Sequence, residues 1–247
     1  MPGRRLRRPG FAYKGGAMDF LLDGLLRAFG LLFSGDPETW AAVSVTARSS
    51  AIALAGSLLI GAPLGFLLSV AHFRGRATAR LAVDTLLALP TVLIGLLVYA
   101  FLTHRGPLGG MDLLFTIPGM AAGQALLGLP IVAALTAQAV EALDVRIRHT
   151  LLTLGANPRQ VAMGLLWEAR FAVMLAGLTA FGRIVSEVGI AMMVGGNIKW
   201  HTRTITTAIA LETGKGQFAM GVALGLVLLA LALVVNLGAA WLRRRMA

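Results

Sequence analysis

Cysteine is absent from this 247-residue sequence, and charged residues make up only 13% of it. Without cysteine, disulfides and thiolate metal sites are excluded. The four histidines lie in different loops without the spacing of metal ligands, so no metal site is predicted. A soluble domain carries about 25% charged residues, whereas this chain is 57% hydrophobic. The composition therefore indicates a protein solvated by lipid.

Long apolar runs are present where charge is lacking. Three of these runs contain no charged residue, a fourth contains only Asp84, and a fifth contains only Arg183 and Glu187. Each run reaches about the 20 residues that an α-helix needs to cross ~30 Å of hydrocarbon. We therefore predict an all-α, polytopic membrane protein with five spans, at residues 51–70, 81–103, 113–140, 171–195 and 217–242.

The distribution of basic residues predicts the orientation. Residues 71–80, residues 141–170 and the C-terminal tail are rich in arginine. The opposite loops carry only Arg105, Lys199, Arg203 and Lys215. The positive-inside rule then places the arginine-rich segments and the C-terminus in the cytoplasm, and the N-terminus outside. The net charge of +11 follows from this orientation and does not indicate nucleic-acid binding.

The N-terminal segment divides into two parts before the predicted membrane domain, residues 38–243. Residues 1–17 are basic, rich in glycine and proline, and lack the apolar core of a signal peptide. We expect a disordered tail or an over-extended start. Residues 18–36 are apolar on one side and interrupted by Asp23 and Arg27, which favours a helix lying in the membrane interface. A sixth span is the alternative.

A helical hairpin, residues 141–167, is predicted between the third and fourth spans. One face of a helix expected over residues 141–154 carries an apolar stripe formed by Leu143, Ile147, Leu151 and Leu154. Gly155 follows it as a left-handed terminating residue. The hairpin is either a well-capped connector or a docking element, and the residues alone favour neither. The start of its second helix is predicted from Asn157 as the cap, Pro158 in the first turn and Gln160 three residues on.

Several motifs are similar to those of one transporter family. The Leu-Gly-Ala-x-Pro run around Gly155 resembles the coupling loop of type I ABC importer permeases, although His149, Thr150 and Leu151 replace that family's Glu-Ala-Ala triplet. FGRIVSE, residues 181–187, resembles the Ala-Arg-Ala-x-Gly-Glu element of molybdate and sulfate permeases, with Ser186 in place of the glycine. Longer runs are similar to the permease of tungstate importers: LALPTVLIGLLVYAFLTHRGPLG (87–109), GQALLGLPI (123–131), LLWEARFA (165–172) and VGGNIKWHTRTITTAIALETGKG (194–216).

The resemblance implies the MetI-like fold of these permeases, with five core transmembrane helices, an N-terminal amphipathic helix and a place in the cell inner membrane. It implies import of tungstate, with molybdate or sulfate as the alternative. The implied partners are a second copy of the chain, two ABC ATPase subunits that bind ATP and magnesium, and an extracytoplasmic binding protein. The chain itself is expected to be no enzyme and to hold no cofactor. The hairpin would dock on the ATPase through His149, Thr150, Leu151, Gly155, Asn157, Pro158 and Gln160.

Arg183 and Glu187 are the charged residues expected deepest in the membrane. Four positions apart near mid-span, they would share a helix face. A charge there costs at least ~2.5–3.5 kcal/mol, so such residues usually face the bundle interior or a water-filled path. They are either a structural ion pair, a gating contact with a partner subunit, or, with Ser186, part of an anion path in which Arg183 meets the oxyanion.

The predicted outer segment before the last span is rich in hydrogen-bond donors. It is either a solvated loop or, given the apolar residues among 205–211, a short helix at the mouth of the path that contacts the binding protein. Lys215 lies between two glycines but lacks the spacing and the Ser/Thr of a phosphate loop. The residues expected on the binding-protein side are Asn197, Trp200, Thr202 and Arg203.

Two other classes of protein compete with the permease. A secondary transporter would show inverted repeats, which the sequence does not display. A membrane-embedded enzyme would need paired carboxylates or a cluster of histidine and serine near one leaflet. Asp84 and Glu187 belong to different spans, so neither alternative is favoured.

Overall fold

The computed structural model describes residues 26, 30, 35–71 and 73–246 of the chain. The predicted tail, 1–17, and nearly all of the predicted interfacial helix, 18–36, lie outside them. The described residues form helices and no strand, which confirms the all-α fold. In chain order the elements are α2 (Pro37–Val70), α3 (Arg76–Leu87), α4 (Thr91–Leu102), the 3-10 turn η1 (Gly109–Met111), α5 (Ile117–Glu141), α6 (Val145–Thr153), α7 (Pro158–Val185), α8 (Gly189–Gly195), α9 (Ile205–Gly214) and α10 (Phe218–Met246).

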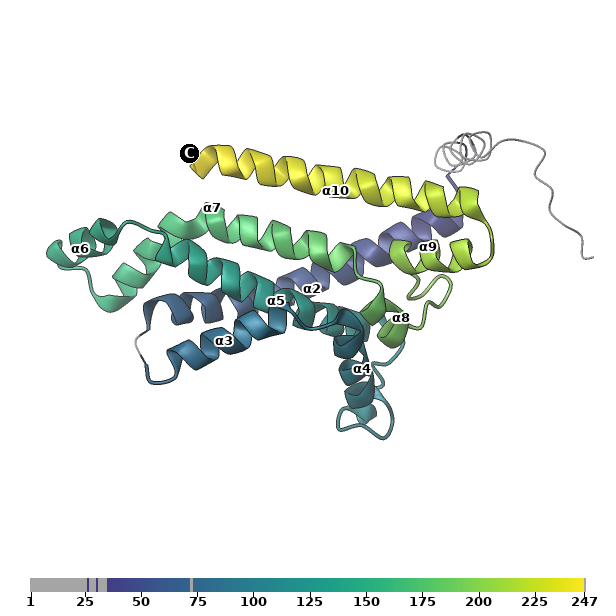
Figure 1. The fold of residues 1–247 in the computed structure, drawn as a ribbon, viewed down its shortest axis with the longest axis horizontal. Helices are drawn as coiled ribbons and strands as arrows, with labels where there is room; N and C mark the ends of the chain where they lie inside the picture. The colour runs from purple at the N-terminus through teal and green to yellow at the C-terminus, as the bar shows by residue number, and fades with distance from the viewer. Residues whose placement is uncertain (1–25, 27–29, 31–34, 72, 247) are drawn as a thin grey trace, which may run out of the picture.

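Four helices are long and apolar enough to cross a membrane: α2, α5, α7 and residues 220–244 of α10. They run along the long axis of the molecule, with α10 lying over α7 (Figure 1). The turn between α2 and α3, the hairpin helix α6 and the C-terminus lie at one end (Figure 1). The start of α10 and the helix α9 lie at the other end. This grouping matches the two sides that the arginine distribution predicts.

Close packing of α2 against α5 forms the centre of the bundle. A Cβ atom on Gly65 would lie 2.3 Å from the carbonyl oxygen of Ala133, and one on Gly61 would lie 2.9 Å from that of Leu129. The Ser57 hydroxyl donates to the Ala125 carbonyl oxygen at 3.0 Å. Small residues are needed wherever two membrane helices approach so closely.

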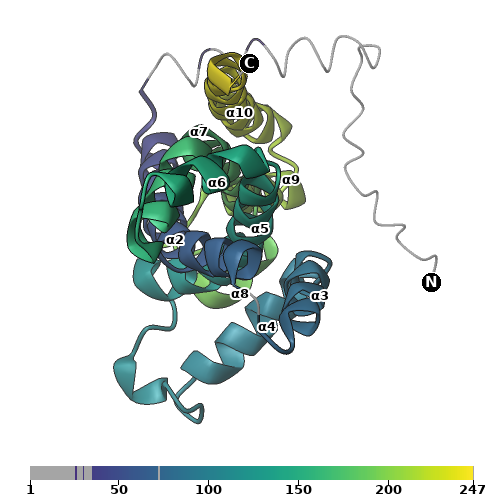
Figure 2. The same ribbon diagram turned by 90° about the vertical axis from the view of Figure 1, so that its left-hand side faces the viewer.

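The second predicted span is broken instead of straight. The axes of α3 and α4 differ by 101° across residues 88–90. Pro90 precedes α4, lacks a backbone N–H and disfavours helix in the residue before it. The break directs α4 away from the long helices (Figure 2). Counted as one broken segment, α3 and α4 bring the number of predicted spans to five.

The fourth predicted span is also interrupted. The helix α7 ends at Val185, and α8 begins at Gly189. The expectation that Arg183 and Glu187 share the face of one helix is therefore wrong. One tertiary and one local hydrogen bond explain the break: the Thr206 hydroxyl donates to the Glu187 carbonyl oxygen at 2.8 Å, and the Glu187 carboxylate accepts from the Ile190 amide at the start of α8 at 3.1 Å. A continuous helix would need both backbone groups for itself.

Candidate functional site

The break between α7 and α8 places Arg183 and Glu187, the two charges expected deepest in the membrane, in different environments. The Arg183 side chain is 49% exposed, and the Glu187 side chain is 2% exposed. Their nearest polar atoms, Arg183 Nη1 and Glu187 Oε2, are 3.9 Å apart, beyond the length of a hydrogen bond. Glu187 is held mainly by its hydrogen bonds to Ile190 and Thr206. The structure thus brings the pair together but leaves much of the guanidinium free.

The first turn of α4 packs against this break. A Cβ atom on Gly189 would lie 3.2 Å from both Glu187 Oε1 and Val92 Cγ2. Farther along, Ile94 and Val98 of α4 share a buried apolar cluster with residues of α8. The broken segment α3–α4 and the break that holds Glu187 therefore form one packed unit.

The surroundings of Ser186 differ from those of Arg183 and Glu187. It is exposed, its hydroxyl donates to the Arg183 carbonyl oxygen at 3.1 Å, and it lines an apolar groove between the end of α7 and α10. The structure therefore places Ser186 next to Arg183 along the chain but on the surface that faces α10.

The predicted turn of the hairpin is confirmed. Gly155 has a φ of +79°, in the left-handed region that glycine tolerates. The Asn157 side chain accepts from the Gln160 amide at 2.9 Å, and the Gln160 side chain accepts from the Asn157 amide at 2.8 Å. This reciprocal capping box begins α7 at Pro158.

The first helix of the hairpin is shorter than predicted. The expectation of a helix over 141–154 is wrong, because α5 continues to Glu141 and α6 begins only at Val145. The Asp144 carboxylate accepts from the Arg146 amide at 2.8 Å and caps α6. The apolar periodicity continues across this cap and therefore does not reveal it.

The hairpin buries one face and exposes apolar side chains at its tip. Leu143, Ile147 and Leu151 pack towards the cluster around Val161. Leu154, the fourth member of the predicted stripe, is 78% exposed. Of the residues expected to contact an ATPase, only Leu151 packs inward; the others are exposed. Large apolar side chains that are also exposed at this end are Val145, Leu152, Leu154 and Met163.

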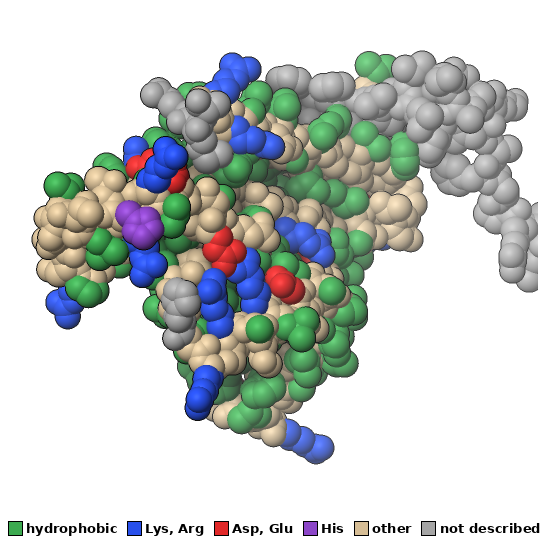
Figure 3. Space-filling view, turned by 60° about the vertical axis from the view of Figure 1, so that its left-hand side comes forward, with side chains coloured by type: hydrophobic (Ala, Val, Ile, Leu, Met, Phe, Trp, Pro, Cys, Tyr) green, Lys and Arg blue, Asp and Glu red, His purple; other side chains and the backbone are tan. Residues whose placement is uncertain are grey.

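A salt-bridge cluster ties the base of the hairpin to α2 and α3. Arg76 donates to the carbonyl oxygens of Leu68 (2.7 Å) and Ser69 (3.0 Å) at the end of α2. Arg76 and Arg80 both pair with Glu141, the last residue of α5. Figure 3 shows basic side chains gathered around acidic ones on this end of the molecule. These arginines predict the orientation of the chain, but no local sequence pattern connects them with Glu141, their partner.

The outer segment folds into the molecule instead of remaining a solvated loop. The short helix expected among residues 205–211 is confirmed as α9, with a capping box between Thr204 and Thr207. Thr202 is buried; its hydroxyl donates to the Gly195 carbonyl oxygen and accepts from the Ile198 amide. Asn197 and Trp200 have φ values of +52° and +68°, which are uncommon for residues other than glycine.

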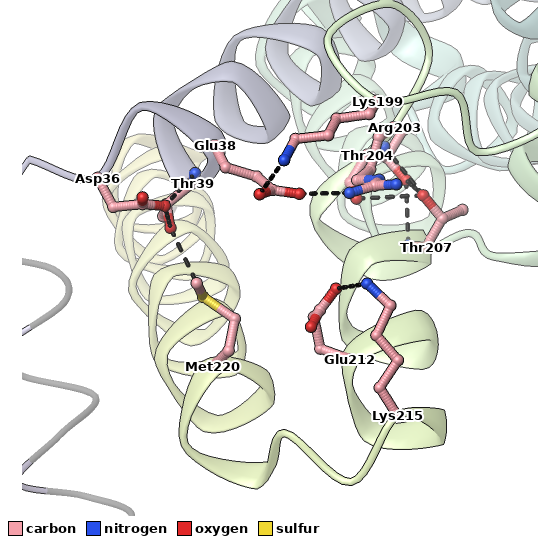
Figure 4. A network of polar contacts seen from close by, with 10 residues as sticks. All are labelled: Asp36, Glu38, Thr39, Lys199, Arg203, Thr204, Thr207, Glu212, Lys215 and Met220. Carbon is pink, nitrogen blue, oxygen red and sulfur yellow. Dashed lines mark hydrogen bonds and ion pairs between the residues drawn. The ribbon is translucent and has the colours of Figure 1, made fainter.

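Among the residues expected on the binding-protein side, Trp200 is the most exposed, at 53%, whereas the Arg203 side chain is only 12% exposed. Arg203 pairs with Glu38 Oε1, and Lys199 Nζ lies 2.7 Å from Glu38 Oε2 (Figure 4). Glu212 pairs with Lys215 at 2.8 Å on the other side of the same cleft. The sequence reading missed both glutamates, since Glu38 precedes the predicted first span by many residues.

Comparison with known proteins identifies the family. Residues 61–247 match the model of the family described as "Binding-protein-dependent transport system inner membrane component". The chain belongs to this family. It is therefore a membrane subunit of a transport system, located in the inner membrane, and the readings as secondary transporter and as enzyme are set aside.

Two curated relatives cover most of the chain. The tungstate uptake system permease protein TupB of Campylobacter jejuni is 44% identical over 89% of this chain and 92% of the relative. The TupB protein of Peptoclostridium acidaminophilum is 36% identical over 89% of this chain and 96% of the relative. The inward-facing MetNI methionine ABC transporter gives a TM-score of 0.69 at 17% identity, covering 86% of this chain and 99% of that chain. The likeness to the MetNI structure confirms the predicted MetI-like fold.

Proposed function

We propose that this chain is the permease of an ABC importer for tungstate. The observation that carries the proposal is the 44% identity to a tungstate uptake permease over 89% of the chain. The experiment measures uptake of radioactive tungstate by cells that lack their own tungstate importer. These cells express this chain together with the ATPase and the binding protein that are encoded beside it. Uptake should resist an excess of sulfate. Uptake of molybdate or sulfate in preference to tungstate would contradict the choice of anion.

The working assembly in this proposal contains two copies of the chain, two ATPase subunits that bind ATP and magnesium, and a binding protein outside. Exposed charge in predicted spans supports a second copy: Arg183 is half exposed, and Asp84 of α3 is exposed. Such side chains need a water-filled path or a protein neighbour. The projecting, apolar α4 supports the same assembly.

Within this assembly, Arg183 is the residue that meets the passing anion. Its guanidinium has free donors, because the nearest Glu187 oxygen is 3.9 Å away and Arg binds oxyanions through several N–H groups. Glu187 holds the break between α7 and α8 and keeps a negative charge beside Arg183, which prevents tight trapping of the anion. Ser186 fixes the end of α7 through its hydrogen bond to Arg183.

The hairpin is the contact with the ATPase. Its exposed tip carries Leu152, Leu154 and Met163, and apolar patches of this kind mark sites of protein association. Gly155 allows the turn, and the capping box fixes the direction of α7. The candidate contact residues are His149, Thr150, Gly155, Asn157, Pro158 and Gln160, with Leu151 supporting them from inside.

Movement of the hairpin reaches the rest of the chain through Glu141. This residue ends α5 at the base of the hairpin and pairs with Arg76 and Arg80 of α3. The α3 helix leads through the bend to α4, which packs on the break that holds Glu187. On the outer side, Trp200 contacts the binding protein, and Asn197, Thr202 and Arg203 hold the segment that presents it.

A further inference from the structure

A charged cleft of about 200 Å³ opens between the first turn of α2, the segment before α9, α9 itself and the start of α10. Ala42, Ala208 and Leu224 line it and also belong to a buried apolar cluster. The cleft is thus closed towards the core and open at the end predicted to lie outside. Its charged lining residues are Glu38, Lys199, Arg203, Glu212 and Lys215.

The cleft has more positive charge and more donors than its own acceptors use. Three cations face two carboxylates, which leaves one net positive charge. A guanidinium has five N–H donors and an ammonium three. The Arg203 Nε atom is buried and has no hydrogen-bond partner within the described residues. The nearby Asp36 carboxylate is engaged by the amide and hydroxyl of Thr39.

Glu38 occupies the position between two of these cations. One of its carboxylate oxygens binds Arg203, and the other lies 2.7 Å from Lys199 Nζ (Figure 4). An oxyanion with several oxygens can bind the same two cations in the same way. Glu38 also belongs to the first turn of α2, where a negative charge stays favourable next to the helix N-terminus. Its carboxylate can therefore leave the cations without losing every favourable interaction.

We propose that this cleft is a weak binding site for a tetrahedral dianionic oxyanion on the permease itself. The anion replaces the Glu38 carboxylate between Lys199 and Arg203 and gains Lys215 from the opposite wall. Competition with Glu38 keeps the affinity low, which suits an ion that must enter and leave again. The identity of the anion as tungstate rests on the proposed function.

The test measures binding of radioactive tungstate by equilibrium dialysis to the purified permease–ATPase complex in nanodiscs, without the binding protein. We expect saturable binding that perrhenate, an ion of the same shape with one negative charge, displaces poorly. Lys199→Met, Arg203→Met and Lys215→Met should each weaken binding about tenfold. Glu38→Gln should tighten it at least about threefold, because it removes the competing charge. Arg105→Met, which removes an exposed cation outside the cleft, is the matched control.

Several outcomes overturn the proposal. Absence of saturable binding does so, and so does a Glu38→Gln variant that binds tungstate equally or less well. Variants that lose capture of the binding protein but keep tungstate binding would show that the cleft docks an acidic partner surface instead. Arg203→Lys keeps the positive charge, and gel filtration checks that the variant complexes remain folded. Together they separate loss of charge from loss of fold.

The result also separates this site from the proposed function. If cells import tungstate while the complex without binding protein binds none, only the cleft site falls. If the complex binds and imports sulfate in preference to tungstate, the cleft site stands and the assignment to tungstate falls.

Discussion

The two ends of this molecule satisfy their polar groups in opposite ways. At the α9 end, buried threonines bond to one another and to backbone groups of α2, α8, α9 and the break between α7 and α8. Thr46 accepts from the Ile205 amide, and Thr206 donates to the Glu187 carbonyl oxygen. At the hairpin end, α6 has no buried residue. The hydrogen bonds of α6 and of the turn after it are local caps, the long-range bonds of Glu141 with Arg76 and Arg80 are exposed, and large apolar side chains face outward.

The difference shows which end is complete in a single chain. Buried hydroxyls need hydrogen-bond partners, and Thr202, Thr204, Thr206 and Thr207 at the α9 end find theirs within the described part of the chain; the buried Arg203 Nε does not. An exposed apolar tip gains stability only when another surface covers it. In the proposed assembly, the hairpin end is therefore the part that a partner covers.

The substitution with the largest expected effect tests whether the hairpin end depends on a partner. No atom lies within 4 Å of a Cβ built on Gly155, so Gly155→Asp should leave the fold intact. The left-handed φ costs roughly 1 kcal/mol, and the new charge lies beside the negative end of α6. We expect uptake to fall about 100-fold, equivalent to ~2.7 kcal/mol of docking energy.

The matched control is Gly155→Asn, which tolerates a left-handed φ without adding charge and should keep most of the uptake. Co-purification of the ATPase and anion-stimulated ATP hydrolysis are the measurements. Normal hydrolysis in Gly155→Asp would show that the hairpin is only a connector.

The next largest effect is expected for substitutions at the break between α7 and α8. Arg183→Met should fold normally, since the side chain is half exposed, and lower uptake about tenfold, or ~1.4 kcal/mol. Glu187→Leu should lower the stability by about 1–3 kcal/mol, because the Ile190 amide loses its acceptor. Arg183→Lys should keep part of the uptake. Recovery of uptake in the Arg183→Met, Glu187→Leu double variant would instead make the two residues a purely structural pair.

The same substitution at each end sharpens the comparison further. Thr202→Val removes a buried hydroxyl that makes two hydrogen bonds and should lower the free energy of unfolding by about 1–3 kcal/mol. Thr150→Val replaces an exposed hydroxyl of α6 and should change it by less than about 0.5 kcal/mol. Thermal unfolding followed by tryptophan fluorescence measures both. Equal shifts would remove the proposed difference between the ends.

The smallest effect on stability is expected for substitutions at residues whose φ is positive. Trp200→Gly relieves about 1 kcal/mol of backbone strain but loses the contact of Lys199 Nζ, 5.1 Å from the ring centroid, worth about 0.5–1 kcal/mol. The net change should be near zero. Gly155→Ala, with strain and no lost contact, should cost about 1 kcal/mol. A large loss in Trp200→Gly would mean that the indole holds the outer segment in place.

Much of the hairpin and little of the outer site could be predicted from the sequence. Gly155, Asn157 and Gln160 act on backbone groups within a few positions, so their spacing carries the information. Arg203 and Glu38 are 165 positions apart, and no local pattern connects them. The exposure of Leu154 was missed because periodicity assumes that a helix continues, and α6 ends at Thr153.

By itself, the sequence determined the membrane class, the helical fold and the capped turn that begins α7, because hydrophobic length and hydrogen bonds between near neighbours suffice for these. Only the tertiary structure decided where the spans break and which charges meet. The Thr206 hydroxyl of α9 donates to the Glu187 carbonyl oxygen, which would accept from a backbone amide in a continuous helix. Apolar runs of equal length can be straight or broken, and the choice depends on partners supplied by distant parts of the chain.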